Sequence, residues 1–219
     1  KFLQVKNITE KKADIYFYGE IVSDEWGKWC DTDKCPEDIA KALEQTVGKE
    51  LNIFINSPGG NVFAGLAIYN MLKRKPEKIT CYVDGVAASI ASVICLAGDE
   101  IVMPKNSFLM IHKPSSACYG NSYEFRKVAD SLDIIESGIL EVYNEKLKDK
   151  KFFYDIKNVV NEETWLKAED AAKYFKDIKI TDDSININNK YQFSNFKNVP
   201  IEILNSNKNI EKQKLQAEL

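Results

Sequence analysis

Residues 79–98 constrain the fold of this chain most strongly. Residues 79–83 are mostly β-branched or aromatic, which predicts a buried strand. Gly85 permits a tight turn, and residues 86–97 are small or apolar and uncharged up to Gly98, which predicts a buried helix over 86–97. Ser89 would lie in the first turn of that helix, where free N–H groups and the helix dipole stabilise an oxyanion. The alternative is a structural serine whose small size lets the helix pack closely.

Two further stretches bear on the role of Ser89. The sequence Ser57-Pro58-Gly59-Gly60 ends the apolar run 51–55 and predicts a turn with exposed backbone N–H groups before an amphipathic helix over 61–74. His112 is the only histidine in 219 residues. Because activation of a serine near neutral pH usually needs an imidazole base, a chain with that chemistry has to use His112. The structural alternatives are an ordinary strand-to-helix loop and a histidine packed in the core.

The order of predicted elements indicates an α/β fold. Strands are expected at 14–22, 51–56, 78–84, 100–103, 108–112 and 178–180, and helices at 36–48, 61–74, 86–97 and 121–148, with a short loop and a helix within 162–175. This alternation predicts a mostly parallel sheet with helices packed on it. Right-handed crossovers place the 57–60 and 85–89 loops at the same end of the sheet, where ligands bind in such folds.

Composition limits the domain organisation and the classes of partner. We expect one domain over 1–181 and a loosely ordered polar tail or linker over 182–219. Thirty basic and 33 acidic residues give a net charge of −3, which argues against nucleic acid or an anionic membrane as partner. No apolar run is long enough to span a bilayer, and residues 1–4 lack the apolar core of a signal peptide.

Cysteine usage predicts a reducing compartment and no metal site. Five cysteines are scattered along the chain, and with a single histidine they do not form a zinc-binding pattern. Free thiols are typical of the cytoplasm. We expect no cofactor, and because the chain has no ATP-binding loop, any unfolding motor would be a separate protein.

The motifs taken in order resemble those of the Clp protease proteolytic subunit. They are Ser-Pro-Gly-Gly at 57–60, Gly-x-Ala-Ala-Ser at 85–89, Met-Pro-x-Asn-Ser at 103–107 and Met-Ile-His at 110–112. The segments 15–23, 68–74 and 163–171 are similar still more closely to Clp-like head-maturation (prohead) proteases of bacteriophages and prophages. The resemblance covers about 13–181. It implies a crotonase/Clp-like fold of repeated β-β-α units, in which the helix over 121–148 projects as a handle that stacks two rings.

The resemblance also implies a function and partners. It implies a serine endopeptidase that matures phage capsids, acts on capsid or scaffold proteins, and forms a ring-type homo-oligomer in the bacterial cytoplasm or inside a procapsid. An ATP-driven unfoldase is an expected separate partner. Other functions stay open: a crotonase-like acyl-CoA enzyme, a Ser–Lys enzyme like the signal-peptide peptidases, and a catalytically silent structural oligomer.

Site residues follow from the matched motifs. The resemblance implies Ser89 as nucleophile, His112 as general base, and the backbone N–H groups of Gly60 and Ile90 as the oxyanion hole. Clp subunits generally carry an Asp two residues before an aromatic-Leu-x-Ala segment, here 165–168. This chain departs from that pattern with Glu163 at the matching position, and the resemblance implies Glu163 as the third member. Alternatives are Glu162 and Asp155, or an acid that only favours the following helix. Residues expected to bind substrate are Gly59, Pro114, Ser115 and Ser116.

Overall fold

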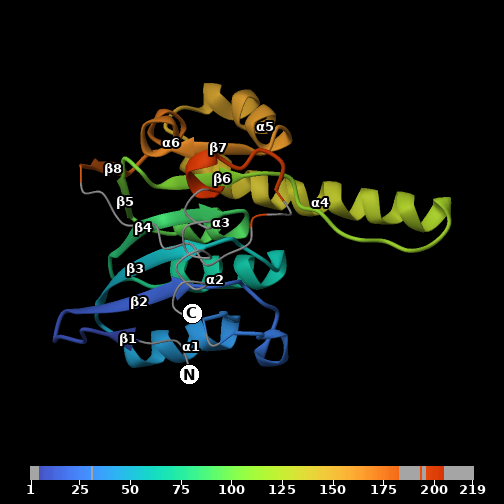
Figure 1. Ribbon diagram of the computed structural model, residues 1–219. Helices are drawn as coiled ribbons and strands as arrows, with labels where there is room; N and C mark the ends of the chain where they lie inside the picture. Colours follow the sequence, from blue (N-terminus) through green and yellow to red (C-terminus); the bar gives the residue numbers. More distant parts are fainter. Residues whose placement is uncertain (1–4, 31, 183–192, 194–195, 205–219) are drawn as a thin grey trace, which may run out of the picture.

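The structure is a computed structural model that describes residues 5–30, 32–182, 193 and 196–204. Its centre is one eight-stranded sheet with the order β1-β2-β3-β4-β5-β8, to which β6 and β7 are attached beside β4 (Figure 1). The expected α/β fold with a mostly parallel sheet is confirmed, since five of the seven strand pairings among the described residues are parallel. Among the described residues, no helix has the length and apolar character needed to cross a membrane.

The strands lie close to the predicted positions. The parallel core consists of β2 (Lys12–Tyr18), β3 (Glu50–Ser57), β4 (Ile79–Ala88), β5 (Glu100–Pro104) and β8 (Ile178–Thr181). β1 (Val5–Lys6) pairs antiparallel with β2 at one edge. A cross-strand aromatic stack of Tyr16, Phe54 and Tyr82, with both centroid separations 4.8 Å, joins β2, β3 and β4 in register. This register places the ends of β3 and β4 next to each other.

Helices cover the sheet, and one of them projects. The helices are α1 (Pro36–Gln45), α2 (Val62–Lys73), α3 (Ile90–Cys95), α4 (Ser122–Lys146), α5 (Phe153–Asn161) and α6 (Ala168–Tyr174), with the 3-10 turns η1 (Glu25–Gly27) and η2 (Lys150–Phe152). Fully buried Ile39, Ile68 and Ile94 of α1, α2 and α3 join the same core as the strand residues. The start of α4 extends away from the body, as predicted for the long helix (Figure 1).

The predicted helix over 86–97 is wrong at its start. β4 continues as a strand through Ala88, because Val86, Ala87 and Ala88 pair in parallel with Phe108, Leu109 and Met110 of β6 (Phe108–Ile111). Helix α3 begins only at Ile90. The small residues 86–88 fit a helix locally, but the ladder with β6 is a long-range interaction that local sequence does not reveal. Ser89 therefore lies at the junction of strand and helix.

The region 149–175 contains more structure than was predicted. Residues 162–175 were expected to form a loop and a helix, but Thr164–Lys167 form strand β7, which pairs antiparallel with β6. The 3-10 turn η2 and helix α5 precede it. The short sequence Thr-Trp-Leu-Lys forms a strand because it pairs with β6. The same pairing determines the position of the neighbouring Glu163 relative to the end of β6.

Part of the predicted tail over 182–219 packs on the domain. Phe193 and Ile203 are 2% and 0% exposed and contact a second apolar cluster with Val86, Phe108 and Met110. The boundary between 181 and 182 stays a prediction, and residues 183–192, 194–195 and 205–219 of the tail lie outside the described residues.

Candidate active site

Ser89 occupies a sharp elbow between β4 and α3. Its φ of 54° and ψ of −129° are unusual for a residue with a side chain, and such conformations cost about 1–3 kcal/mol. Hydrogen bonds hold the elbow: the Ser89 N–H donates to Met110 O at 2.8 Å, and Ser89 O accepts from Ser92 N at 2.9 Å and Ser92 Oγ at 2.6 Å. Strain kept in place by surrounding bonds is frequent at functional sites.

His112 lies within hydrogen-bond distance of Ser89. The parallel register ends with the pair Ala88 and Met110, so Ser89 lies one residue and His112 two residues beyond this pair, although 23 residues separate them in the chain. His112 Nε2 is 2.8 Å from Ser89 Oγ. The predicted nucleophile and base are thus brought together by the pairing of β4 with β6.

The imidazole of His112 has a lowered pKa. Its burial lowers the pKa, and the negative charge of Glu163 opposes this by raising it, with burial the larger effect. The neutral ring is therefore favoured, and a neutral ring is the form that accepts a proton from a hydroxyl.

The Gly59-Gly60 turn packs directly against the Ser89 elbow. A Cβ placed on Gly59, whose φ is +95°, would be 2.7 Å from Ser89 Cβ and 3.2 Å from Ile90 N. A Cβ on Gly60 would be 2.1 Å from Ile21 O. Only glycine permits both approaches.

Backbone N–H groups of Gly60 and Ile90 are available beside Ser89. Ile21 donates its N–H to Gly59 O at 2.8 Å and accepts from the Asn61 N–H at 2.7 Å, so the intervening Gly60 directs its own N–H away from Ile21. Ile90 is the first residue of α3, where an N–H has no partner within the helix. Both predicted oxyanion donors therefore belong to the two backbone segments that meet at Ser89.

Glu163 lies opposite His112 but is hydrogen-bonded elsewhere. The antiparallel register pairs Ile111 with Thr164, so the next position along each strand sets His112 against Glu163. Glu163 Oε1 accepts the backbone N–H groups of Lys197 at 2.5 Å and Asn198 at 2.9 Å. Within the part of the chain that the structure describes, no hydrogen bond joins His112 to a carboxylate.

The other two carboxylates considered are less suited. Glu162 and Asp155 are exposed, and neither is among the charges that act on the pKa of His112. Glu163 is the candidate acid that reaches His112 electrostatically.

A cavity of about 560 Å³ opens beside Ser89 and His112. Three of the four predicted substrate-binding residues line it, namely Gly59, Pro114 and Ser115. Ser116 does not, and its hydroxyl donates to Ala117 O at 3.3 Å. The wall residues that the sequence analysis missed include the segment from Glu20 to Ser23, Gly27 and Phe196. The segment from Glu20 to Ser23 overlaps the end of the strand predicted over 14–22, whereas β2 already ends at Tyr18, and Phe196 has no local signal.

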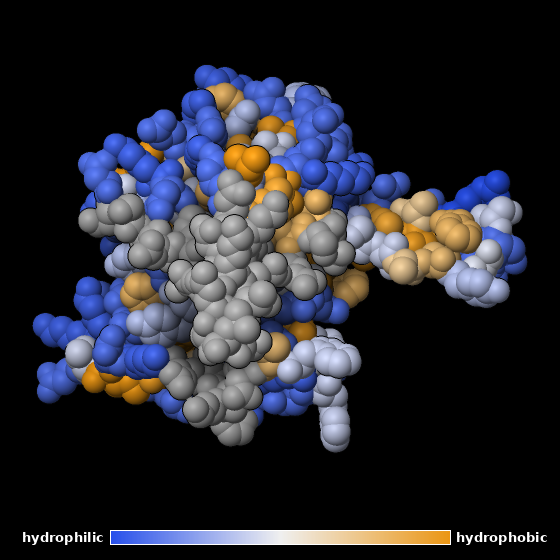
Figure 2. Space-filling model, in the orientation of Figure 1, coloured by the Kyte–Doolittle hydropathy of each residue, from blue (hydrophilic) through white to orange (hydrophobic). Residues whose placement is uncertain are grey.

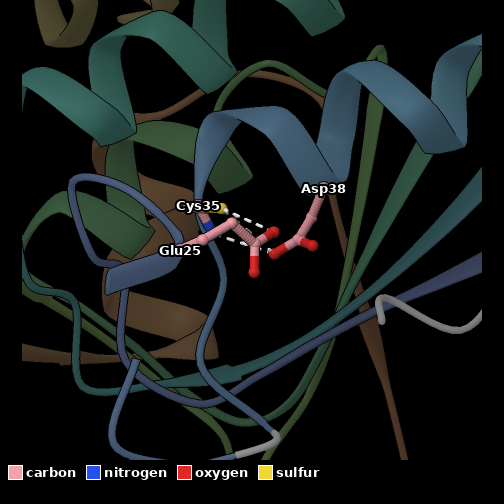
Figure 3. A group of neighbouring side chains, drawn as sticks. All are labelled: Glu25, Cys35 and Asp38. Carbon is pink, nitrogen blue, oxygen red and sulfur yellow. Dashed lines mark hydrogen bonds between the residues drawn. The ribbon is translucent and has the colours of Figure 1, made fainter. Parts of the chain in front are cut away.

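A cluster of metal-ligand-type side chains lies outside this site. Glu25, Cys35 and Asp38 bring one ligand atom each within 4.8 Å of one another (Figure 3). The ammonium of Lys28 lies 3.0 Å from Glu25 Oε2 and 2.7 Å from Asp38 Oδ2, so this cluster already contains a cation. Asp38 also accepts the Cys35 N–H and closes a capping box at the start of α1. These contacts of Glu25 and Lys28 hold the loop 25–28 against the start of α1. Gly27 of this loop lines the cavity beside Ser89.

A serine on a strand-to-helix elbow, a histidine at hydrogen-bond distance and nearby free N–H groups form the arrangement found in serine hydrolases. The α/β domain of this chain has a site with that arrangement. The family model described as Clp protease matches residues 31–175, and the chain belongs to the Clp protease family.

Curated relatives carry matching names. The chain is 30% identical over 135 residues to the "ATP-dependent Clp protease proteolytic subunit" of Deinococcus radiodurans, covering 59% of this chain and 64% of the relative. It is 31% identical over 132 residues to the "ATP-dependent Clp protease proteolytic subunit 1" of Protochlamydia amoebophila, covering 58% and 63%. The chain thus spans somewhat less than two thirds of the length of these relatives.

Proposed function

We propose that the protein is a serine endopeptidase, with Ser89 as nucleophile and His112 as general base. The observation that carries this proposal is the 2.8 Å separation of His112 Nε2 from Ser89 Oγ, on a strained and half-buried elbow beside a cavity. Membership of the Clp protease family supports it.

The proposed mechanism is acyl transfer in two stages. Ser89 Oγ attacks the carbonyl carbon of a peptide bond while its proton passes to His112 Nε2, and the carbonyl oxygen becomes an oxyanion. The N–H groups of Gly60 and Ile90 would stabilise that oxyanion. When the intermediate collapses, the C–N bond breaks and His112 donates its proton to the leaving amine. Water then attacks the acyl group on Ser89 by the same route, releasing the new carboxyl end and regenerating the serine.

Glu163 is proposed as the third member of a Ser–His–acid site. Its charge favours the imidazolium that forms during attack, because it raises the pKa of His112. Its position opposite His112 in the β6–β7 register supports this role.

Proposed partners follow from the family and from exposed apolar side chains. Phe125 and Ile134 of α4 are 53% and 72% exposed, and apolar residues gather along the projecting part of the molecule (Figure 2). Such surfaces mark association sites. We propose a ring-type homo-oligomer in the cytoplasm that degrades or processes proteins. The words "ATP-dependent" in the relatives' names support a separate ATP-driven unfoldase as partner. A 25 kDa monomer in light scattering at every concentration would contradict the oligomer.

The phage resemblance supports a finer proposal, that the natural substrates are capsid or scaffold proteins. Incubating the protein with such proteins and locating the cut sites by mass spectrometry tests it, with the Ser89→Ala variant as the control. Undigested capsid and scaffold proteins alongside efficient cleavage of unstructured peptides would contradict the capsid role.

The central test separates a protease from the alternatives. Ser89→Ala should abolish peptide cleavage and labelling by a fluorophosphonate while leaving the melting temperature nearly unchanged, because only one hydroxyl is removed. Cleavage retained by Ser89→Ala would refute the proposal. Turnover of an acyl-CoA thioester without peptide cleavage would favour the acyl-CoA enzyme instead, and absence of both activities with an unlabelled Ser89 would favour a structural oligomer.

A further inference from the structure

Residues 196–198 contact the proposed catalytic residues from outside the family's shared region. The family model ends at residue 175, so this segment is not part of the match. Phe196 nonetheless lines the cavity, and its ring meets the ring of His112 edge-on, with 5.5 Å between centroids and 71° between planes. An aromatic ring at this place excludes water from one side of the imidazole.

The two residues after Phe196 hold the loop that carries Glu163. The backbone N–H groups of Lys197 and Asn198 both donate to Glu163 Oε1. The side chain of Asn198 donates through Nδ2 to the carbonyl oxygens of Glu162 at 2.7 Å and Glu163 at 3.1 Å. Glu163 has a φ of 51°, so these bonds hold a strained residue as well as its carboxylate.

The segment is anchored on both sides of this contact. Trp165 meets Phe193 and Phe196 at centroid separations of 5.6 and 6.0 Å, and Ile203 is fully buried. Lys167 pairs with Glu202 at 3.3 Å on the surface. Packing alone explains the apolar contacts, but it does not explain why two N–H groups converge on a single carboxylate oxygen opposite His112.

We propose that residues 196–198 are a positioning element of the active site: the N–H groups of Lys197 and Asn198 fix the carboxylate of Glu163 beside His112, and Phe196 shields the imidazole. This proposal rests on the proposed protease function. Catalysis in this protein would therefore need a segment that the matched family region does not contain.

Substitution of Phe196 and substitution of Asn198 should move the pKa of His112 in opposite directions. Burial lowers that pKa, so Phe196→Ala, which admits water, should raise it and shift the acid limb of kcat/KM to higher pH. Glu163 raises the pKa, and Asn198→Ala removes the Nδ2 bonds that hold the Glu162–Glu163 backbone, so the carboxylate should move away from His112 and the limb should shift downward. Other charged residues on the segments around the ring are Glu20 in the cavity wall, the exposed Lys197, and Lys113, which pairs with Glu136 of α4 at 3.0 Å. The substitutions leave all of them unchanged.

A double-mutant cycle provides the decisive test. Asn198→Ala should lower kcat on a short fluorogenic peptide by about tenfold with KM nearly unchanged, since a displaced catalytic group costs rate. In the Glu163→Gln background the same substitution should have almost no further effect, because Asn198 acts through Glu163. Ile201→Ala is the matched control, as Ile201 is 68% exposed in the same segment, and it should leave kcat and the pH profile unchanged.

Clear outcomes would overturn the inference. Additive effects of Asn198→Ala and Glu163→Gln, or unchanged kcat and pH limbs in Asn198→Ala and Phe196→Ala, would show that the segment only adds stability. The fluorophosphonate reaction of Ser89 separates this failure from failure of the proposed function. If Ser89→Ala is inactive and unlabelled while the segment variants behave like the unmodified protein, only the positioning role is refuted.

Discussion

Replacing Gly59 by alanine should disable the site without unfolding the protein. The added Cβ would lie 2.7 Å from both Ala88 O and Ser89 Cβ, whereas ordinary contacts of this kind are about 3.5–4.0 Å. The elbow must then move by roughly 1 Å, and a misplacement of this size costs about 100-fold in rate. The positive φ of +95° adds about 1–2 kcal/mol of backbone strain for alanine.

Gly48→Ala is the matched control for that strain. Gly48 also has a positive φ, +73°, but a Cβ there would meet nothing within 4 Å. Both variants should therefore lose stability, with melting temperatures lower by roughly 2–8 °C. Only Gly59→Ala should lose kcat/KM for a short peptide, measured below saturation. If Gly59→Ala keeps kcat/KM within about threefold of Gly48→Ala, the contact between the Gly59 turn and the Ser89 elbow does not set the catalytic geometry.

Three further predictions concern pH and buried polar groups. Burial lowers the pKa of His112 more than Glu163 raises it, so the acid limb of kcat/KM should lie below the ordinary histidine value of about 6.5; a limb at or above that value would contradict the desolvated ring. Tyr143→Phe removes the 2.8 Å bond to Ser92 Oγ and should cost about 1 kcal/mol in urea unfolding, while an unchanged free energy of unfolding would show that this bond is not stabilising. Lys146→Met strips the buried Gly98 carbonyl of its 2.6 Å donor and should cost about 1–3 kcal/mol in the same measurement, with a more stable variant as the opposing result.

The sequence predicted those features that depend on local signals. Apolar runs such as 51–55 and the Pro-Gly-Gly turn at 58–60 identified strands, helices and the parallel order. Buried strands and glycine turns can be recognised from the sequence of a few neighbouring residues. The proximity of Ser89 and His112 was predicted from the family's motifs, not from local signals. The two residues are 23 positions apart in the chain, and the pairing of β4 with β6 brings them together.

Features that depend on long-range pairing were not predictable. Ala87 and Ala88 carry no strand signal, and they are in a strand only because β6 lies beside them. β7 is equally dependent on β6. Phe196 and Asn198 lie in a polar stretch with no periodic pattern, so nothing near them in the chain indicates their contact with His112 and Glu163.

The ion pair between Lys28 and Asp38 should make one wall of the cavity sensitive to acid. Burial raises the pKa of Asp38, but hydrogen bonds from Lys28 and the Cys35 backbone outweigh it, and the net pKa lies below the usual value. A carboxylate of lowered pKa stabilises the folded loop above its unfolded pKa, and that contribution is lost as pH falls through its folded pKa. Acid should therefore release η1, and with it Gly27 at the cavity, as the pH falls below the usual titration range of a carboxyl group. The exposed Trp26 and Trp29 in this loop place an intrinsic fluorophore on the moving wall.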